Sequence, residues 1–184
     1  MTAYAIGLFF HFVGMVGLFV GYGLEWTASS LLRRAKSSDQ ARNALGIYRL
    51  SMPISGPGLL VLIISGGYLA SVTGSMRQGW ISGALLGIVF ALGIGFVFIL
   101  PRVRTIRASL PQETVALSEA GLARVKDPMV TTLIRVRFMV ALGIVALMTS
   151  KPQLLMTSLF VLLGAIVIGL LCAATVWTKP AAAR

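Results

Sequence analysis

Charged residues, histidine and cysteine are all scarce in this sequence. Only 11% of its 184 residues are charged, and it contains a single histidine, His11, and a single cysteine, Cys172. One cysteine excludes a disulfide within the chain, and one histidine excludes a pair of histidine ligands to haem iron from the same chain. No familiar catalytic motif is present. The sequence therefore favours a protein without catalytic activity.

Acidic residues are the rarest charged group, with 5 Asp and Glu against 16 Lys and Arg, a net charge of +11. Such an excess of positive charge is found in nucleic-acid-binding proteins. It is also the ordinary composition of the loops of a membrane protein, which lie beside anionic lipid. Because 57% of the residues are apolar, we expect the lipid bilayer, and no nucleic acid, as the partner of these charges.

Long apolar segments account for most of the chain. Each has close to the roughly 20 residues that a helix needs to cross a bilayer, and they lie at about residues 4–26, 53–72, 80–100, 128–150 and 152–177. Two amphipathic surface helices are predicted between them, at about 38–50 and 111–126, from apolar residues at helical spacing. The sequence therefore predicts an all-α, multi-pass bundle with five spans, forming a single domain over residues 1–184.

The basic residues alternate between the gaps. All of them lie in the gaps after the first and third spans, at the start of the fourth span or in the C-terminal tail, except Arg77 and Lys151. The positive-inside rule then places the N-terminus outside and the C-terminus in the cytoplasm of a bacterial inner membrane. Only an odd number of spans agrees with that orientation.

Small residues form a ridge on the third span, because they recur at every fourth position. They are Gly79, Gly83, Gly87, Ala91 and Gly95. Such a ridge lets another helix backbone approach closely. Packing inside the bundle and contact with another chain, in a homodimer or a larger membrane complex, are both compatible with it.

His11 is the first candidate site residue, since ionisable groups inside a membrane are costly and are often functional. Glycines on the same side of the helix predict that it faces protein or an internal cavity. A neutral imidazole there can bind haem iron or copper, or can simply hydrogen-bond a neighbouring helix. Met15 lies one turn away, and Met148 is predicted in the same outer half of the membrane; thioether and imidazole ligands suit Cu(I). The methionines can equally serve to fill gaps in the core.

Arg135 and Arg137 form the second candidate site, because they lie too deep in the fourth span to be ordinary loop residues. Their side chains point roughly 200° apart on a helix. We expect one to reach lipid phosphate and the other to face the bundle, where Glu25 is its predicted partner. A structural ion pair is one interpretation. Binding of an anionic cofactor group, such as a quinone head or a haem propionate, is the other.

Several local motifs occur together: HFVGMVGLFVGYG in the first span, ISGGYLA at the end of the second, Trp80 at the start of the third, and IRVRFMVALGIVALMTSKP in the fourth. This combination resembles small bacterial integral membrane proteins of uncharacterised function related to the copper-resistance protein D group. More distantly, it is similar to the J-type protoporphyrinogen oxidases, which bind haem and carry a histidine in the first span. The resemblance places His11 at that histidine.

The leading hypothesis is a non-catalytic accessory or partner-binding subunit in the inner membrane, because polar groups inside the spans are few. A haem b-binding or redox protein with His11 as axial ligand is the first alternative. Copper handling by His11, Met15 and Met148 is the second.

Overall fold

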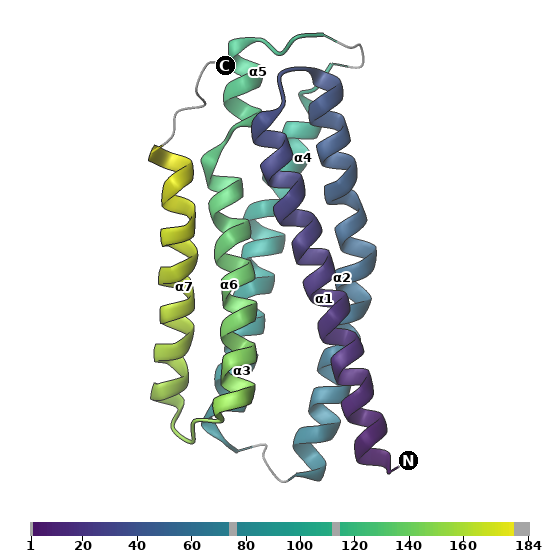
Figure 1. Cartoon of the computed structure of the whole chain (residues 1–184), viewed down its shortest axis with the longest axis vertical. Helices are drawn as coiled ribbons and strands as arrows, with labels where there is room; N and C mark the ends of the chain where they lie inside the picture. Colours follow the sequence, from purple (N-terminus) through teal and green to yellow (C-terminus); the bar gives the residue numbers. More distant parts are fainter. Residues whose placement is uncertain (1, 74–76, 112–114, 179–184) are drawn as a thin grey trace.

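The computed structural model describes residues 2–73, 77–111 and 115–178, and this part of the chain is predominantly helical, without strands (Figure 1). Five of its helices are long and apolar enough to cross a membrane. The prediction of an all-α protein with five helices of membrane-spanning length and hydropathy is therefore confirmed. The elements are α1 (Ala3–Arg34), α2 (Ser38–Val72), α3 (Gly79–Gly93), the π-helical segment η1 (Ile94–Ile99), α4 (Leu100–Ala108), α5 (Glu119–Val125), α6 (Pro128–Ser150) and α7 (Leu155–Thr178).

Helix α2 is longer than the sequence indicated. The predicted surface helix at 38–50 and the predicted span at 53–72 form one continuous helix, in spite of Pro53 and Pro57. Each proline removes one backbone hydrogen bond. The helix nevertheless continues through both positions to Val72.

The third span also continues past its predicted end. Helix α3 passes without a break into η1 and then into α4, which ends at Ala108. In η1 the backbone is wound more widely, so that the N–H of Leu100 bonds to the carbonyl of Gly95, five residues earlier. Such π segments are rare, and they occur frequently at functional sites.

The predicted surface helix at 111–126 is only partly correct. Helix α5 covers its second half, and residues 112–114 lie outside the described part of the chain. Residues 115–117 instead run extended beside 36–38: the N–H of Ser38 donates to the carbonyl of Val115 at 3.0 Å, and that of Leu117 to the carbonyl of Lys36 at 3.1 Å. These non-local bonds favour an extended chain over a helical one and join the two basic gaps.

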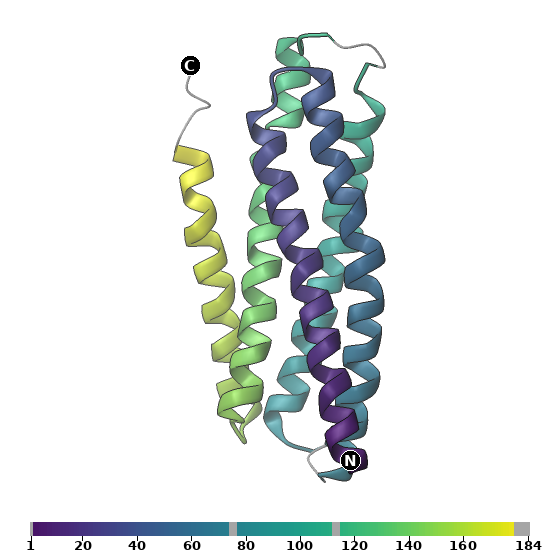
Figure 2. The same ribbon diagram turned by 45° about the vertical axis from the view of Figure 1, so that its right-hand side comes forward.

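The helices are arranged in two groups. Helices α1 and α2 pack against each other along their length, and α3, α6 and α7 form the second group, with α7 at the edge farthest from α2 (Figures 1 and 2). Contacts of α1 with α6, and of α2 with α4, join the two groups. The seam between the groups is where the polar residues of the interior gather.

The ridge of small residues on α3 faces the second group. A Cβ atom at Gly79 would lie 2.5 Å from the backbone of Leu155, and one at Gly87 would lie 2.9 Å from the side chain of Ile144. These glycines therefore allow close packing within the chain, against α6 and α7. Contact of the ridge with a second chain stays a prediction.

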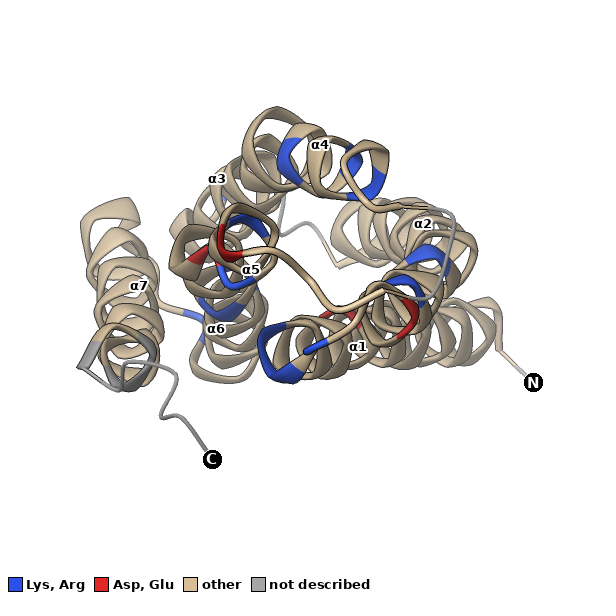
Figure 3. Cartoon of the chain, turned by 90° about the horizontal axis from the view of Figure 1, so that it is seen from above, with Lys and Arg blue, Asp and Glu red and all other residues tan. Residues whose placement is uncertain are grey.

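Charge is concentrated at one end of the bundle, where α4, α5 and the C-terminal end of α1 lie (Figure 3). The long faces between the two ends expose large apolar side chains, among them Phe9, Val16, Leu60, Phe96 and Leu171. An apolar belt around five membrane-length helices is the surface of a membrane protein.

Candidate functional site

A buried ion pair lies in the seam between the two helix groups. Nη1 of Arg137, on α6, donates to both carboxylate oxygens of Glu25, on α1, at 2.9 and 3.1 Å. Only 3% of the Glu25 side chain and 11% of the Arg137 side chain are exposed. Two ionised groups so far from water stabilise each other only because they are paired at this short distance.

Residues of α1, α2 and η1 complete this site. The guanidinium lies 4.3 Å from the ring centre of Tyr22, close enough for a cation–π contact. The hydroxyl of Ser51, on α2, is 3.3 Å from the Glu25 carboxylate. Gly95, in η1, also lies against the guanidinium group. A Cβ atom at this position would lie 3.0 Å from the guanidinium carbon, so a residue larger than glycine would crowd the arginine. The π segment therefore brings bare backbone against the charge.

The prediction that one arginine faces the bundle and pairs with Glu25 is confirmed for Arg137. The expectation that the other reaches lipid phosphate is not what the structure shows for Arg135. Its guanidinium lies 5.3 Å from the ring centre of Trp26 and donates to the backbone carbonyl of Cys172, on α7. The two arginines therefore point to different neighbours, as their spacing predicts, but both contact protein.

His11 lies in the same seam, nearer the N-terminal end of α1. Its Nδ1 is 3.3 Å from the hydroxyl oxygen of Ser65, on α2. That hydroxyl donates its proton to the carbonyl of Val61 at 2.6 Å. In the tautomer with the proton on Nδ1, His11 donates to this hydroxyl oxygen, and Nε2 keeps its lone pair. The prediction that His11 faces a neighbouring helix is confirmed.

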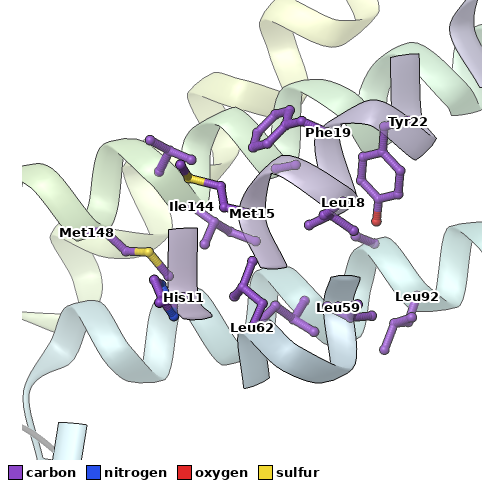
Figure 4. Close-up of a pocket in the computed structure, with 14 residues that line it drawn as sticks. His11, Met15, Leu18, Phe19, Tyr22, Leu59, Leu62, Leu92, Ile144 and Met148 are labelled. Atoms are coloured by element: carbon purple, nitrogen blue, oxygen red, sulfur yellow. The ribbon is translucent and has the colours of Figure 1, made fainter. Parts of the chain in front are cut away.

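A small cavity of about 30 Å³ lies beside the imidazole (Figure 4). His11, Met15 and Met148 all line it, so the three predicted metal-site residues come together from α1 and α6. In Figure 4 the end of the Met148 side chain points toward the His11 ring. The remaining wall is apolar, with Leu18, Leu62 and Ile144 among its residues.

No protein-family model, curated protein or solved structure matches this chain. The chemistry of the site therefore has to be argued from its own residues. Among the described residues no three His, Cys, Asp or Glu side chains gather closely enough to hold a metal ion.

The residues do not fit a haem that joins the two sites. His11 and Glu25 are separated by about 21 Å along α1 at 1.5 Å per residue, and Arg137 is held at Glu25. Propionates attached to the edge of a porphyrin do not reach that far from an iron bound at His11. The 30 Å³ beside His11 is also well below the roughly 300–1,000 Å³ of sites for ligands of that size. The predicted cofactor residues His11, Arg135 and Arg137 are therefore not brought together.

Four polar residues of these sites were not singled out from the sequence: Tyr22, Tyr48, Ser51 and Ser65. A usable signal is present for the two serines, because Ser51 lies at the depth of Glu25 and Ser65 at the depth of His11 in an antiparallel pair of helices. The phenol groups carry no such signal, since tyrosine is common both in membrane cores and at membrane surfaces.

Proposed function

We propose that this chain is a non-catalytic accessory protein of the bacterial inner membrane that holds one Cu(I) ion on His11, Met15 and Met148. The observation that carries the proposal is the shared cavity: one imidazole and two thioethers, from α1 and α6, line a space of about 30 Å³. A single ion suits that space better than a haem.

The ligand types favour Cu(I) over other metals. Thioether sulfur is a soft ligand that Cu(I) accepts readily, whereas Mg²⁺ and Ca²⁺ prefer oxygen. Ser65 fixes the orientation of the ring through Nδ1, as the outer-shell partners of metal-binding histidines usually do, and leaves Nε2 for the metal. A metal with one positive charge also costs less to bury in an apolar wall than a divalent ion.

Elemental analysis of the purified protein, loaded with Cu(I) under reducing conditions in lipid nanodiscs, tests this proposal. We expect one copper per chain, and none above background in His11→Leu. Changes to outer-shell residues alone weaken metal sites by roughly 10- to 100-fold, so the loss of a direct ligand in Met148→Leu is expected to weaken Cu(I) binding at least about tenfold.

Met156→Leu is the matched control, because Met156 is 63% exposed and lies outside the cavity. This variant is expected to bind copper as the unmodified chain does. Copper content that is absent from the unmodified protein, or that is equal in His11→Leu, would overturn the assignment.

The proposal includes an orientation, with the basic end of the bundle in the cytoplasm and the N-terminus outside. Its support is the gathering of Lys and Arg at one end (Figure 3) together with the positive-inside rule. In a Cys172→Ala background we expect a membrane-impermeant maleimide to label Gln153→Cys in intact spheroplasts. Arg104→Cys, at the other end, is expected to react only after lysis. Both positions are exposed, so the reverse pattern would mean the opposite orientation.

A further inference from the structure

A second cavity, of about 70 Å³, lies next to the Glu25–Arg137 pair, between α1, α2, η1 and α6. Its polar lining comes from Glu25, Tyr48, Ser55 and Arg137. It shares Leu18, Leu59 and Leu92 with the cavity beside His11, so these leucines separate the two. Far more space is present than one water molecule needs, and the copper proposal makes no use of it.

The charged wall has a donor left over. Both hydrogen bonds from Arg137 to Glu25 come from Nη1, whereas its Nε is buried and has no hydrogen-bond partner among the described residues. A buried donor on a charged group is costly when it is unsatisfied. Arg137 as a whole is only 9% exposed. Arg137 also lines the cavity, so an acceptor that enters it lies beside a guanidinium group whose N–H donors are not all used by Glu25.

The acceptor that suits this wall is neutral. Glu25 already balances the charge of Arg137 at 2.9 Å, and a second anion would be repelled by that carboxylate in a medium that screens charge poorly. A carbonyl oxygen accepts a hydrogen bond without adding charge. It therefore satisfies the guanidinium at less cost than a carboxylate or a phosphate does.

The cavity opens toward the lipid between α2 and η1. Met52 and Phe96 line it and are 43% and 56% exposed, on the apolar belt of the bundle. Gly56 also lines the cavity, and nothing stands within 4 Å of the position where its Cβ would be. A molecule that enters by this route comes from the bilayer and is lipid-soluble.

We propose that this cavity binds a lipid-soluble carbonyl compound of the quinone class, whose carbonyl oxygen accepts a hydrogen bond from Arg137. The volume is smaller than the roughly 150 Å³ that encloses a benzene ring. Only the carbonyl-bearing edge of the ring is therefore enclosed, and the rest of the ring and its tail lie in the opening beside Gly56 and Phe96.

The test measures a decyl-substituted benzoquinone in nanodiscs that contain the full-length protein, against empty nanodiscs of the same lipid. We expect an excess of quinone that saturates at one per chain. Decanoate is the anionic probe, and we expect it to displace little of this excess. If the excess quinone never saturates, it reflects partition into lipid, and the proposed site is wrong. If decanoate at equal concentration displaces the quinone, the preference for a neutral carbonyl is wrong.

Two leucine variants of α2 identify the opening. Gly56→Leu places a side chain in the opening and is expected to raise the half-saturating quinone concentration at least about tenfold. Gly67→Leu is the matched control, since Gly67 is exposed, has the same empty surroundings and lies outside the cavity lining. Both changes favour the helix, so both variants are expected to fold. Equal binding by the two variants would overturn the assignment, and the titration of the unmodified protein tests the site independently of either.

Discussion

Glu25→Leu is expected to lower the free energy of unfolding by about 3–5 kcal/mol, because it leaves the Arg137 guanidinium buried without its counter-charge. The carboxylate accepts two hydrogen bonds from Arg137, and its side chain is only 3% exposed. The measurement is the shift of the SDS-induced unfolding transition in micelles, followed by tryptophan fluorescence.

Two further variants separate the charge effect from the loss of packing. Glu25→Leu combined with Arg137→Met removes both charges, and we expect it to return to within about 1 kcal/mol of the unmodified protein, since replacing a whole buried pair by apolar groups is often neutral. Glu119→Leu changes an exposed acid on α5 and is expected to alter stability by less than about 0.5 kcal/mol. If the double variant were as unstable as Glu25→Leu, the ion pair would not be the cause.

Gly14→Ala is expected to destabilise the protein by about 1–3 kcal/mol, the usual cost of overpacking. The added Cβ would lie 2.7 Å from the backbone nitrogen of Leu62 and 2.8 Å from the carbonyl oxygen of Gly58. Both are backbone atoms of α2, so the clash is relieved only if the whole helix moves. The same unfolding measurement applies.

Gly23→Ala is the matched control for this prediction. Gly23 lies on the same helix, and nothing stands within 4 Å of its would-be Cβ. Alanine there is expected to leave stability unchanged or to raise it by up to about 1 kcal/mol through helix propensity. A similar loss of stability in both variants would mean that close approach of α1 to α2 does not hold the pair together.

The spans and the ion pair were predictable because each depends on a simple count. An apolar run of about 20 residues is long enough to cross a bilayer whatever its neighbours are. Glu25 is the only acidic residue within the predicted spans, so an arginine that faces the bundle has one partner available. The contacts of Arg135 with Trp26 and the backbone of Cys172 were not predicted, because these groups carry no charge and leave no signal in the sequence.

Other features depend on contacts between distant segments. The π segment Ile94–Ile99 is apolar on every side, so hydrophobic periodicity does not distinguish it from an α-helix. Residues 115–117 have apolar spacing that suits a helix, but their hydrogen bonds to residues 36–38 hold them extended. At the candidate site, the sequence indicated only that His11 and Met148 lie in the same outer half of the membrane, and their meeting in one cavity depends on how α1 packs beside α6.

The ion pair has a consequence for the order in which the protein is made. Glu25 and Arg137 are 112 positions apart, and at roughly 5–20 residues per second the ribosome needs about 6–22 s to synthesise the chain between them. Helix α1 therefore exists with its carboxylate long before α6 does. Ser51 follows Glu25 by only 26 positions, and its hydroxyl lies within hydrogen-bonding reach of that carboxylate. Within the α1–α2 hairpin this hydroxyl can therefore turn from the carbonyl of Tyr48 toward the acid until Arg137 is made.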